Sequence, residues 1–237
     1  METIYHPSAE RGHVNFGWLD SHHSFSFGNW HDRDKVNFGA LRVLNDDVVK
    51  GGKGFDDDQH ENMEIISIPL KGALSHKDST GTEGIVYTGD VQIMSAGSGI
   101  SHSEYNASHY DNANYLQIWI FPKQPGIRPR HDQRSFHADD RKDKWQIIVS
   151  PRAEDHALWI NQDARLALTR LSAGKALVYQ PAFPGNGIYL FILEGSIRTG
   201  DRTLEKRDGL GIAGVEKVSL TATTETELLA IEVPMFG

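Results

Sequence analysis

The sequence predicts an all-β protein built of two β domains, each a sandwich or a jelly roll. Short runs rich in β-branched and aromatic residues recur along the chain, separated by Gly, Asp, Asn and Pro. No long segment shows the periodicity of an amphipathic helix. A stretch dense in proline, glycine and mixed charge interrupts the strand pattern near the middle. We therefore expect an N-terminal domain over residues 1–122, a crossover over 123–143 and a C-terminal domain over 144–237.

The strand-like runs are evenly spaced, which is typical of a sandwich or jelly roll. In chain order they cover residues 40–49, 63–70, 84–94, 114–121, 144–150, 175–180, 188–197 and 227–234. One further segment, "NQDARLALTRL" (161–171), is compatible with a helical turn or with another strand. The pattern therefore leaves little room for helices.

The composition excludes several classes of chemistry. The 237 residues include no cysteine, which excludes disulfides, thiol nucleophiles, iron–sulfur clusters and thiolate metal sites. The formal net charge of −8 disfavours general attraction to nucleic acid or to an anionic membrane. The chain has no apolar run near the length of a membrane span, and its N-terminus lacks the apolar core of a signal peptide. We expect a cytoplasmic protein that binds neither nucleic acid directly nor membranes.

Any metal must then be held by His, Asp or Glu. Of the twelve histidines, eleven lie at or before His137. Two polar clusters in this part of the chain have a spacing that suits a metal site: Asp58-x-His60-x3-Glu64 and His102-x-Glu104. Residues two apart on a strand point to the same face, so each cluster presents a pair of ligands. Two such pairs on neighbouring strands can converge on one divalent cation.

A weak internal repeat relates the two halves of the chain. "IISIPLKGAL" (65–74) parallels "YLFILEGSI" (189–197), and "GDVQIMSAG" (89–97) parallels "DGLGIAGVE" (208–216). Counted from these anchors, the positions of Asp58, His60, His102 and Glu104 correspond to Pro181, Phe183, Thr221 and Thr223. We therefore expect a metal site in the first domain and a structural second domain without ligands.

Long motifs of the first half resemble the pirin family of bicupins. They are "RGHVNFGWLDSHHSFSFGNW" (11–30), "FGALRVLNDDVV" (38–49), "MEIISIPLKGALSHKDSTG" (63–81), "IMSAGSGISHSEYN" (93–106), "LQIWIFP" (116–122) and "GIRPRHDQRSF" (126–136). The sequence is most similar to the bacterial pirin-like branch that includes quercetin dioxygenases. The resemblance implies two cupin barrels of the jelly-roll type, packed together, with a single metal in the first.

The resemblance also implies a ligand set of three histidines and one glutamate. His60, His102 and Glu104 match three of these positions, and Asp58 occupies the place of the first histidine. A carboxylate oxygen binds a first-row cation at about the distance of an imidazole nitrogen. We therefore expect Asp58, His60, His102 and Glu104 to bind one divalent transition metal. Fe(II) is the expected ion, with Mn, Co, Ni, Cu or Zn as alternatives.

Other polar and aromatic residues receive weaker assignments. Glu64 keeps the parity of His60 and is expected to lie behind the ligands, or to substitute for one of them. His76 is interpreted as a turn or pocket-rim residue. Histidines 22 and 23 are expected to cover one end of the barrel, and the remaining histidines to be solvated or structural. The aromatic residues Phe25, Phe27, Phe38 and Trp119 are expected to pack in the core or to line a pocket for a planar ligand.

Three functions compete at this point. The first is a dioxygenase that opens the ring of a flavonol such as quercetin with O2, in which Glu104 takes the proton of the substrate hydroxyl. The second, suggested by the animal branch of the family, is a non-enzymatic metal-binding or redox-sensing protein that acts on a protein partner. The third is a degenerate cupin that has lost its metal and binds a small molecule.

Overall fold

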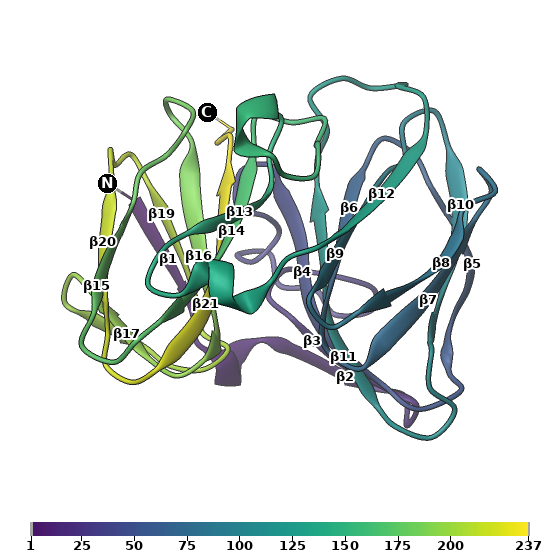
Figure 1. Cartoon of the computed structure of the whole chain (residues 1–237), viewed down its shortest axis with the longest axis horizontal. Helices are drawn as coiled ribbons and strands as arrows, with labels where there is room; N and C mark the ends of the chain where they lie inside the picture. The colour runs from purple at the N-terminus through teal and green to yellow at the C-terminus, as the bar shows by residue number, and fades with distance from the viewer. Residues whose placement is uncertain (1, 237) are drawn as a thin grey trace.

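The computed structural model describes residues 2–236 as two antiparallel β-barrels that lie side by side (Figure 1). Each barrel consists of one large and one small sheet. The two-barrel, all-β architecture expected from the sequence is confirmed. Within residues 2–236, no helix is long and apolar enough to cross a membrane.

The N-terminal barrel pairs a seven-stranded sheet with a four-stranded sheet. In spatial order the large sheet is β12 (Arg130–Ser135), β9 (Asp90–Ser95), β6 (Glu64–Lys71), β11 (Ala113–Ile120), β4 (Leu41–Val49), β3 (Leu19–His23) and β2 (Gly12–Asn15). The small sheet is β5 (Gly54–His60), β10 (Ile100–Asn106), β7 (Ala73–Asp78) and β8 (Glu83–Tyr87).

The C-terminal barrel pairs a six-stranded sheet with a four-stranded sheet. The large sheet is β1 (Glu2–His6), β19 (Gly209–Ala213), β16 (Gly187–Glu194), β21 (Thr226–Val233), β14 (Arg165–Leu171) and β13 (Gln146–Val149). The small sheet is β15 (Ala176–Tyr179), β20 (Val218–Ala222), β17 (Ile197–Thr199) and β18 (Arg202–Leu204). Residues 2–236 also contain three short 3-10 helices: η1 (Ser8–Glu10), η2 (Ala138–Arg141) and η3 (Ala153–Asp155).

Most apolar runs of the sequence correspond to strands of the two large sheets, residues 175–180 contain β15 of the small C-terminal sheet, and two of the runs divide. Residues 84–94 form β8 and β9 around a turn, and residues 188–197 form β16 and the start of β17. The ambiguous segment 161–171 contains strand β14 and no helix. The predicted crossover 123–143 contains β12, which pairs with β9 in the N-terminal sheet. β1, at the start of the chain, pairs with β19 in the C-terminal sheet.

The two large sheets pack on each other through a shared hydrophobic core. Alternation along each strand divides its residues between this core and the inside of its own barrel. On β11, Leu116 and Ile118 lie in the shared core, while Gln117 and Trp119 line a cavity inside the N-terminal barrel. β14, β16 and β21 of the other barrel supply the opposing apolar side chains. One face of each large sheet therefore packs in the core at the junction between the barrels, and the other face lines the interior of its own barrel.

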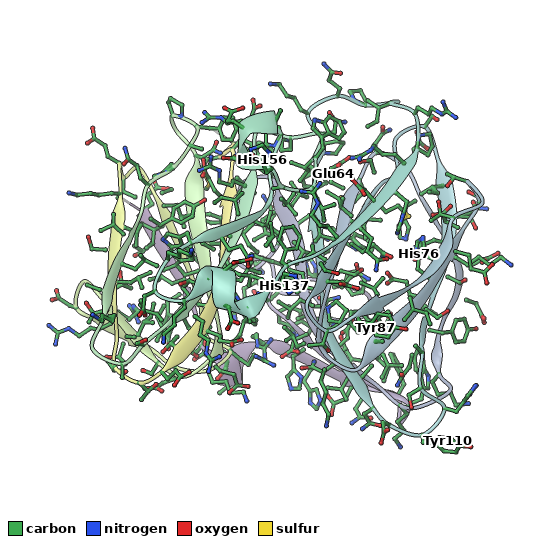
Figure 2. The ribbon with its side chains drawn as sticks, viewed as in Figure 1. Glu64, His76, Tyr87, Tyr110, His137 and His156 are labelled. Carbon is green, nitrogen blue, oxygen red and sulfur yellow. The ribbon has the colours of Figure 1, made fainter. Side chains whose placement is uncertain are left out.

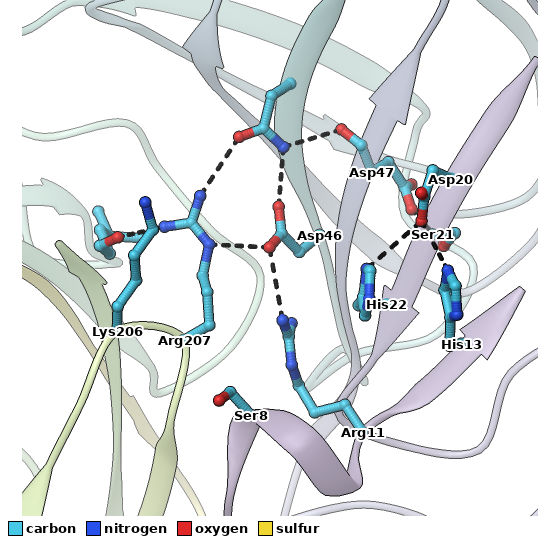
Figure 3. Close-up of polar contacts among 12 residues, drawn as sticks. Ser8, Arg11, His13, Asp20, Ser21, His22, Asp46, Asp47, Lys206 and Arg207 are labelled. Atoms are coloured by element: carbon cyan, nitrogen blue, oxygen red, sulfur yellow. Dashed lines mark hydrogen bonds and ion pairs between the residues drawn. The ribbon is translucent and has the colours of Figure 1, made fainter. Parts of the chain in front are cut away.

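Polar contacts also join the barrels beside this core (Figure 3). Arg207 of the C-terminal barrel donates to Asp46 of β4 over 2.8 Å and to Asn114 of β11 over 3.3 Å. Arg11 approaches the same Asp46 carboxylate at 3.6 Å, and Asn114 donates to it over 2.8 Å. Since Asp46 is buried, these partners balance a charge that would otherwise be costly at the junction.

Candidate metal centre

Strand β10 places its polar residues between two neighbouring strands of the small sheet. On the β5 side, His102 lies opposite Asp58, and on the β7 side Glu104 lies opposite His76. Directly opposed residues of an antiparallel pair project to the same face. Three strands thus direct polar side chains toward one region of the barrel interior.

His60 and His102 face one another in this region. Their Nε2 atoms are 3.0 Å apart and their rings meet edge to face. Two nitrogens bound at about 2.1 Å to one ion at a right angle would also lie about 3.0 Å apart. Burial lowers the pKa of His102 and of His60, and the facing His102 lowers the pKa of His60 further. Both rings are therefore kept in the neutral form that can bind a metal.

Glu104 is buried and held by three side-chain donors. Its Oε1 accepts hydrogen bonds from Ser67 Oγ and Gln92 Nε2, each over 2.9 Å, and its Oε2 accepts one from Gln117 Nε2 over 2.8 Å. An ionised carboxylate has about four acceptor positions. The three donors fix the orientation of Glu104 and leave one acceptor position free for a cation or a proton.

Asp58 lies at the outer edge of this group. Its Oδ2 is 3.4 Å from His60 Nε2, and its side chain is 66% exposed. The sequence-based ligands therefore differ in their surroundings. The side chains of His102, Glu104 and His60 are enclosed in the barrel, and the side chain of Asp58 is open to solvent.

His76 lies deeper in the barrel than the sequence suggests. Its position in strand β7 and its exposure of 1% contradict the interpretation as a turn or pocket-rim residue. His76, His102 and Glu104 form a compact group whose potential ligand atoms all lie within 4.8 Å of one another. Figure 2 shows His76 within the N-terminal barrel. The missed signal was the motif His76-x-Asp78, which has the same alternation as His102-x-Glu104.

Glu64 is not part of the site. Its Oε2 accepts hydrogen bonds from Ser95 Oγ and from the backbone N–H of Asn161, which belongs to the C-terminal half of the chain. Burial raises its pKa to about 7. The expected parity with His60 is wrong because β5 ends at His60, β6 begins at Glu64, and Asn62 between them has a positive φ of 49°. The chain turns there, and Glu64 points toward the junction (Figure 2).

A cavity of about 70 Å³ opens beside His60, His102 and Glu104. It adjoins a second cavity of about 170 Å³, and the two share Phe27, Asn45, Asp47 and Phe55 in their walls. Phe27 and Trp119 line this space, as the pocket alternative anticipated, and their rings meet edge to face. Phe25 and Phe38 instead pack in the core between the barrels.

The cavity wall also holds a carboxyl group that the sequence analysis missed. Burial raises the pKa of Asp47 to about 7, although the Ser21 hydroxyl donates a hydrogen bond to it. Ser21 Oγ is also 2.7 Å from His23 Nε2. These three residues line the adjoining cavity. No spacing motif linked them, because β3 and β4 bring them together from separate parts of the chain.

The donor set fits a divalent transition metal. Imidazole nitrogens and one carboxylate oxygen are ligands that Fe, Co, Ni, Cu and Zn accept. Within residues 2–236, Nδ1 of His76 is buried without a hydrogen-bond partner, so it has a lone pair or a proton left to place. Such unsatisfied atoms are uncommon in folded proteins and indicate a missing partner such as an ion.

A second group of potential ligands lies on the surface. His13, Asp20 and His22 occupy one face of the β2–β3 hairpin (Figure 3), with His13 Nε2 2.8 Å and His22 Nδ1 3.6 Å from Asp20 Oδ1. Unlike the interior group, this one is partly exposed to solvent. It has to be kept apart from the interior site in any measurement of metal binding.

Comparisons with known proteins agree with the two-barrel description. A family model described as Pirin matches residues 6–120, and one described as the quercetinase C-terminal cupin domain matches residues 147–233. The chain is 40% identical over 225 residues to a protein of Escherichia coli K12 named quercetin 2,3-dioxygenase, covering 95% of this chain and 96% of that protein. It is 37% identical over 227 residues to a pirin-like protein of Caulobacter vibrioides, covering 95% and 97%.

A solved structure extends the likeness to the backbone. The bacterial pirin YhhW of Escherichia coli, in complex with nickel(II), superposes with a TM-score of 0.93 at 37% identity. The superposition covers 99% of this chain and 100% of that one.

Proposed function

The chain belongs to the pirin family, and from this premise we propose that it is a metal-dependent dioxygenase that opens the ring of a flavonol such as quercetin with O2. The observation that carries the proposal is the convergence of His60, His102 and Glu104 beside an aromatic-lined cavity. Relatives named quercetin 2,3-dioxygenase support the reaction class.

In this proposal His60, His102 and Glu104 hold one divalent transition metal, with Asp58 as the fourth ligand predicted from the sequence. A bound ion would supply Lewis acidity and redox chemistry toward the substrate and O2. A nickel complex of a relative supports a first-row divalent ion in this family. Fe(II) stays the expected ion for this chain and is part of the proposal.

The residues of the chain would position the substrate and accept its proton. Phe27 and Trp119 give the cavity an apolar wall that suits a planar aromatic ring. Glu104 would take the hydroxyl proton of the substrate in exchange for one of its three hydrogen bonds, because its one free acceptor position goes to the ion. Asp47 is a second carboxyl group in the same wall, and a pKa of about 7 would let it receive that proton near neutral pH.

The test is an assay of quercetin and O2 consumption by protein reconstituted with Fe(II), Ni(II) or Co(II). We expect one quercetin per O2, label from ¹⁸O₂ in the product, and a rate that scales with bound metal. Full turnover by protein stripped of metal would contradict the proposal. Metal binding without turnover of any flavonol would instead favour the non-enzymatic, partner-binding alternative.

A further inference from the structure

We propose that His76 of β7, rather than Asp58 of β5, is the fourth protein ligand of the metal. This inference rests on the metal centre of the proposed function and deepens it. The ligand set would then be His60, His76, His102 and Glu104. Three histidines and one glutamate would be restored, with the third imidazole contributed by a different strand.

The strand register places His76 where a ligand is needed. β10 lies between β5 and β7, and His76 lies directly opposite Glu104 across the β7–β10 pair. Opposed side chains project to one face, which for Glu104 is the inside of the barrel. The compact group of His76, His102 and Glu104 follows from this register. His60 lies outside that group and approaches it at His102, Nε2 to Nε2 over 3.0 Å, so the His60 ring would have to move toward the group to bind the same ion.

The hydrogen bonds of His76 leave one nitrogen available. Its Nε2 is 2.8 Å from Asp78 Oδ2, and the other oxygen of Asp78 accepts from the backbone N–H and the hydroxyl of Thr80. Because a carboxylate can only accept here, Nε2 carries the proton and Nδ1 keeps its lone pair. A histidine that binds a metal commonly donates its second N–H to a carboxylate in this way.

The remaining nitrogen has no partner in the protein. Within residues 2–236, His76 Nδ1 is buried and accepts no hydrogen bond, and His76 as a whole is 1% exposed. His131 stacks on the ring with a centroid distance of 4.5 Å, which fixes the plane of the imidazole. A buried acceptor without a donor is rare, and a cation would satisfy it.

Asp58 is less suited to the same position. Its side chain is 66% exposed, and the atom it approaches is Nε2 of His60, at 3.4 Å. Water can therefore satisfy its carboxylate without an ion. In this role Asp58 steadies the His60 ring at the mouth of the cavity, where both residues lie in the wall.

The two ligand sets differ in charge and in the number of imidazoles. Two histidines with two carboxylates would place two negative charges on the ion, whereas three histidines with Glu104 place one. More nitrogen ligands favour Ni, Cu, Co or Zn over Mn. The number of imidazoles bound to the ion is therefore a readout that does not depend on catalysis.

The experiment measures Ni(II) affinity by calorimetry and the number of bound imidazoles by nickel X-ray absorption. All proteins carry His22→Ala, so that ions on the hairpin surface do not contribute. The parent is expected to show three imidazoles. His76→Gln is expected to show two and to lose at least tenfold in affinity, and Asp58→Ala is expected to keep three and lose less than threefold. His109→Gln, which changes an exposed histidine after β10, is the control and should keep three.

Two imidazoles in the parent, or a larger affinity loss in Asp58→Ala than in His76→Gln, would overturn the inference. If His76→Gln does not fold, the counts in the parent and in Asp58→Ala still decide the matter. A parent that turns over quercetin with only two bound imidazoles refutes this inference and leaves the proposed function intact. Three imidazoles without turnover support the inference and refute the proposed function.

Discussion

The two barrels share one frame, but their interiors are filled by opposite kinds of side chain. The C-terminal barrel encloses a continuous apolar cluster supplied by strands such as β16, β20 and β21. The N-terminal barrel has small apolar clusters, around Tyr115 and around Met94, and a polar group that includes His76, His102 and Glu104. This difference shows that a barrel of this fold is stable with either an apolar or a polar interior. Polar residues in the first interior are therefore not required by the architecture, which indicates that they serve a function.

Cavity size alone would have pointed to the wrong barrel. The C-terminal barrel has a cavity of about 690 Å³, roughly ten times the volume of the one beside His60 and His102. Among the described residues that line the larger cavity there is no histidine. Potential metal-binding side chains that point to one region, with polar atoms that lack a partner, identify the site better than the volume of a cavity does.

The largest expected effect tests whether only the first barrel binds the ion. His102→Ala should remove one of the shared ligands and weaken Ni(II) binding at least 100-fold, with loss of turnover. Thr221→Ala changes the residue that the sequence repeat aligns with His102, which lies exposed on β20, and should leave both unchanged. Calorimetry and the quercetin assay check this pair. Equal losses of Ni(II) affinity and turnover in the two variants would contradict the idea that only the first barrel binds the ion.

The next prediction contrasts two buried glutamates. Glu232 in the C-terminal barrel accepts hydrogen bonds from the backbone N–H groups of Ala182 and Phe183 at 3.0 and 2.9 Å, and from the hydroxyl of Tyr179 at 2.9 Å. Backbone N–H donors are fixed in place and cannot reorient to suit the NH2 group of an amide. Glu232→Gln should therefore lower the free energy of unfolding by about 2–3 kcal/mol. Metal binding should remain.

Glu104→Gln should show the reverse pattern. Its donors Ser67, Gln92 and Gln117 can rotate or flip to suit an amide, so the free energy of unfolding should change by less than about 1 kcal/mol. Ni(II) affinity should fall at least tenfold. Urea unfolding of the metal-free proteins and calorimetry measure the two effects. A stability loss in Glu104→Gln equal to that in Glu232→Gln would make Glu104 a structural residue.

A smaller effect concerns pH. The pKa of Asp47 is about 7 in the folded chain, against 3.8 as the ordinary value. Between these values the folded chain holds a proton that the unfolded chain has lost, so the contribution of Asp47 to stability falls as pH rises toward 7. Relative to Asp47→Asn, the wild type should lose about 2 kcal/mol between pH 5 and pH 8.

The comparison with Asp47→Asn is needed because buried histidines act in the opposite direction. Burial lowers the pKa of His6, His23 and His131 to about 4, so these residues destabilise the folded chain as pH falls below their ordinary value. Urea unfolding of both metal-free proteins at the two pH values isolates the carboxyl. Identical pH dependence in wild type and Asp47→Asn would show that Asp47 ionises normally.

The smallest effect is expected at the edge of the site. Asp58→His introduces the residue that the family motif has at this position. If His76 already completes the ligand set, Ni(II) affinity should change by less than threefold. A gain of tenfold or more, measured by calorimetry in the His22→Ala background, would mean that the natural site is short of a ligand at residue 58.

How far the sequence predicted the structure depends on which strands carry the chemistry. β6, β11, β16 and β21 are apolar on their buried faces and were recognisable. β5, with the sequence "GFDDDQH", and β12, with "RHDQRS", lack that pattern because polar residues occupy them. Both are edge strands with no buried residue, and contact with solvent removes the apolar signal from which a strand is normally predicted.

The proposed ligand residues were predictable only where local spacing preserved alternation. His60, His102 and Glu104 follow it, and the structure brings these residues into one region. Glu64 does not follow this alternation, because the chain turns at Asn62. His76 required knowledge that β7 is the other neighbour of β10, which depends on long-range pairing that the sequence pattern does not contain.

The most direct test of the whole account is a crystal structure of the protein loaded with Ni(II), with the ion located by anomalous scattering. We predict one strong peak inside the N-terminal barrel, coordinated by His60, His76, His102 and Glu104. No interior peak is expected in the C-terminal barrel. An ion bound in the C-terminal barrel, or only on the β2–β3 hairpin, would contradict the account.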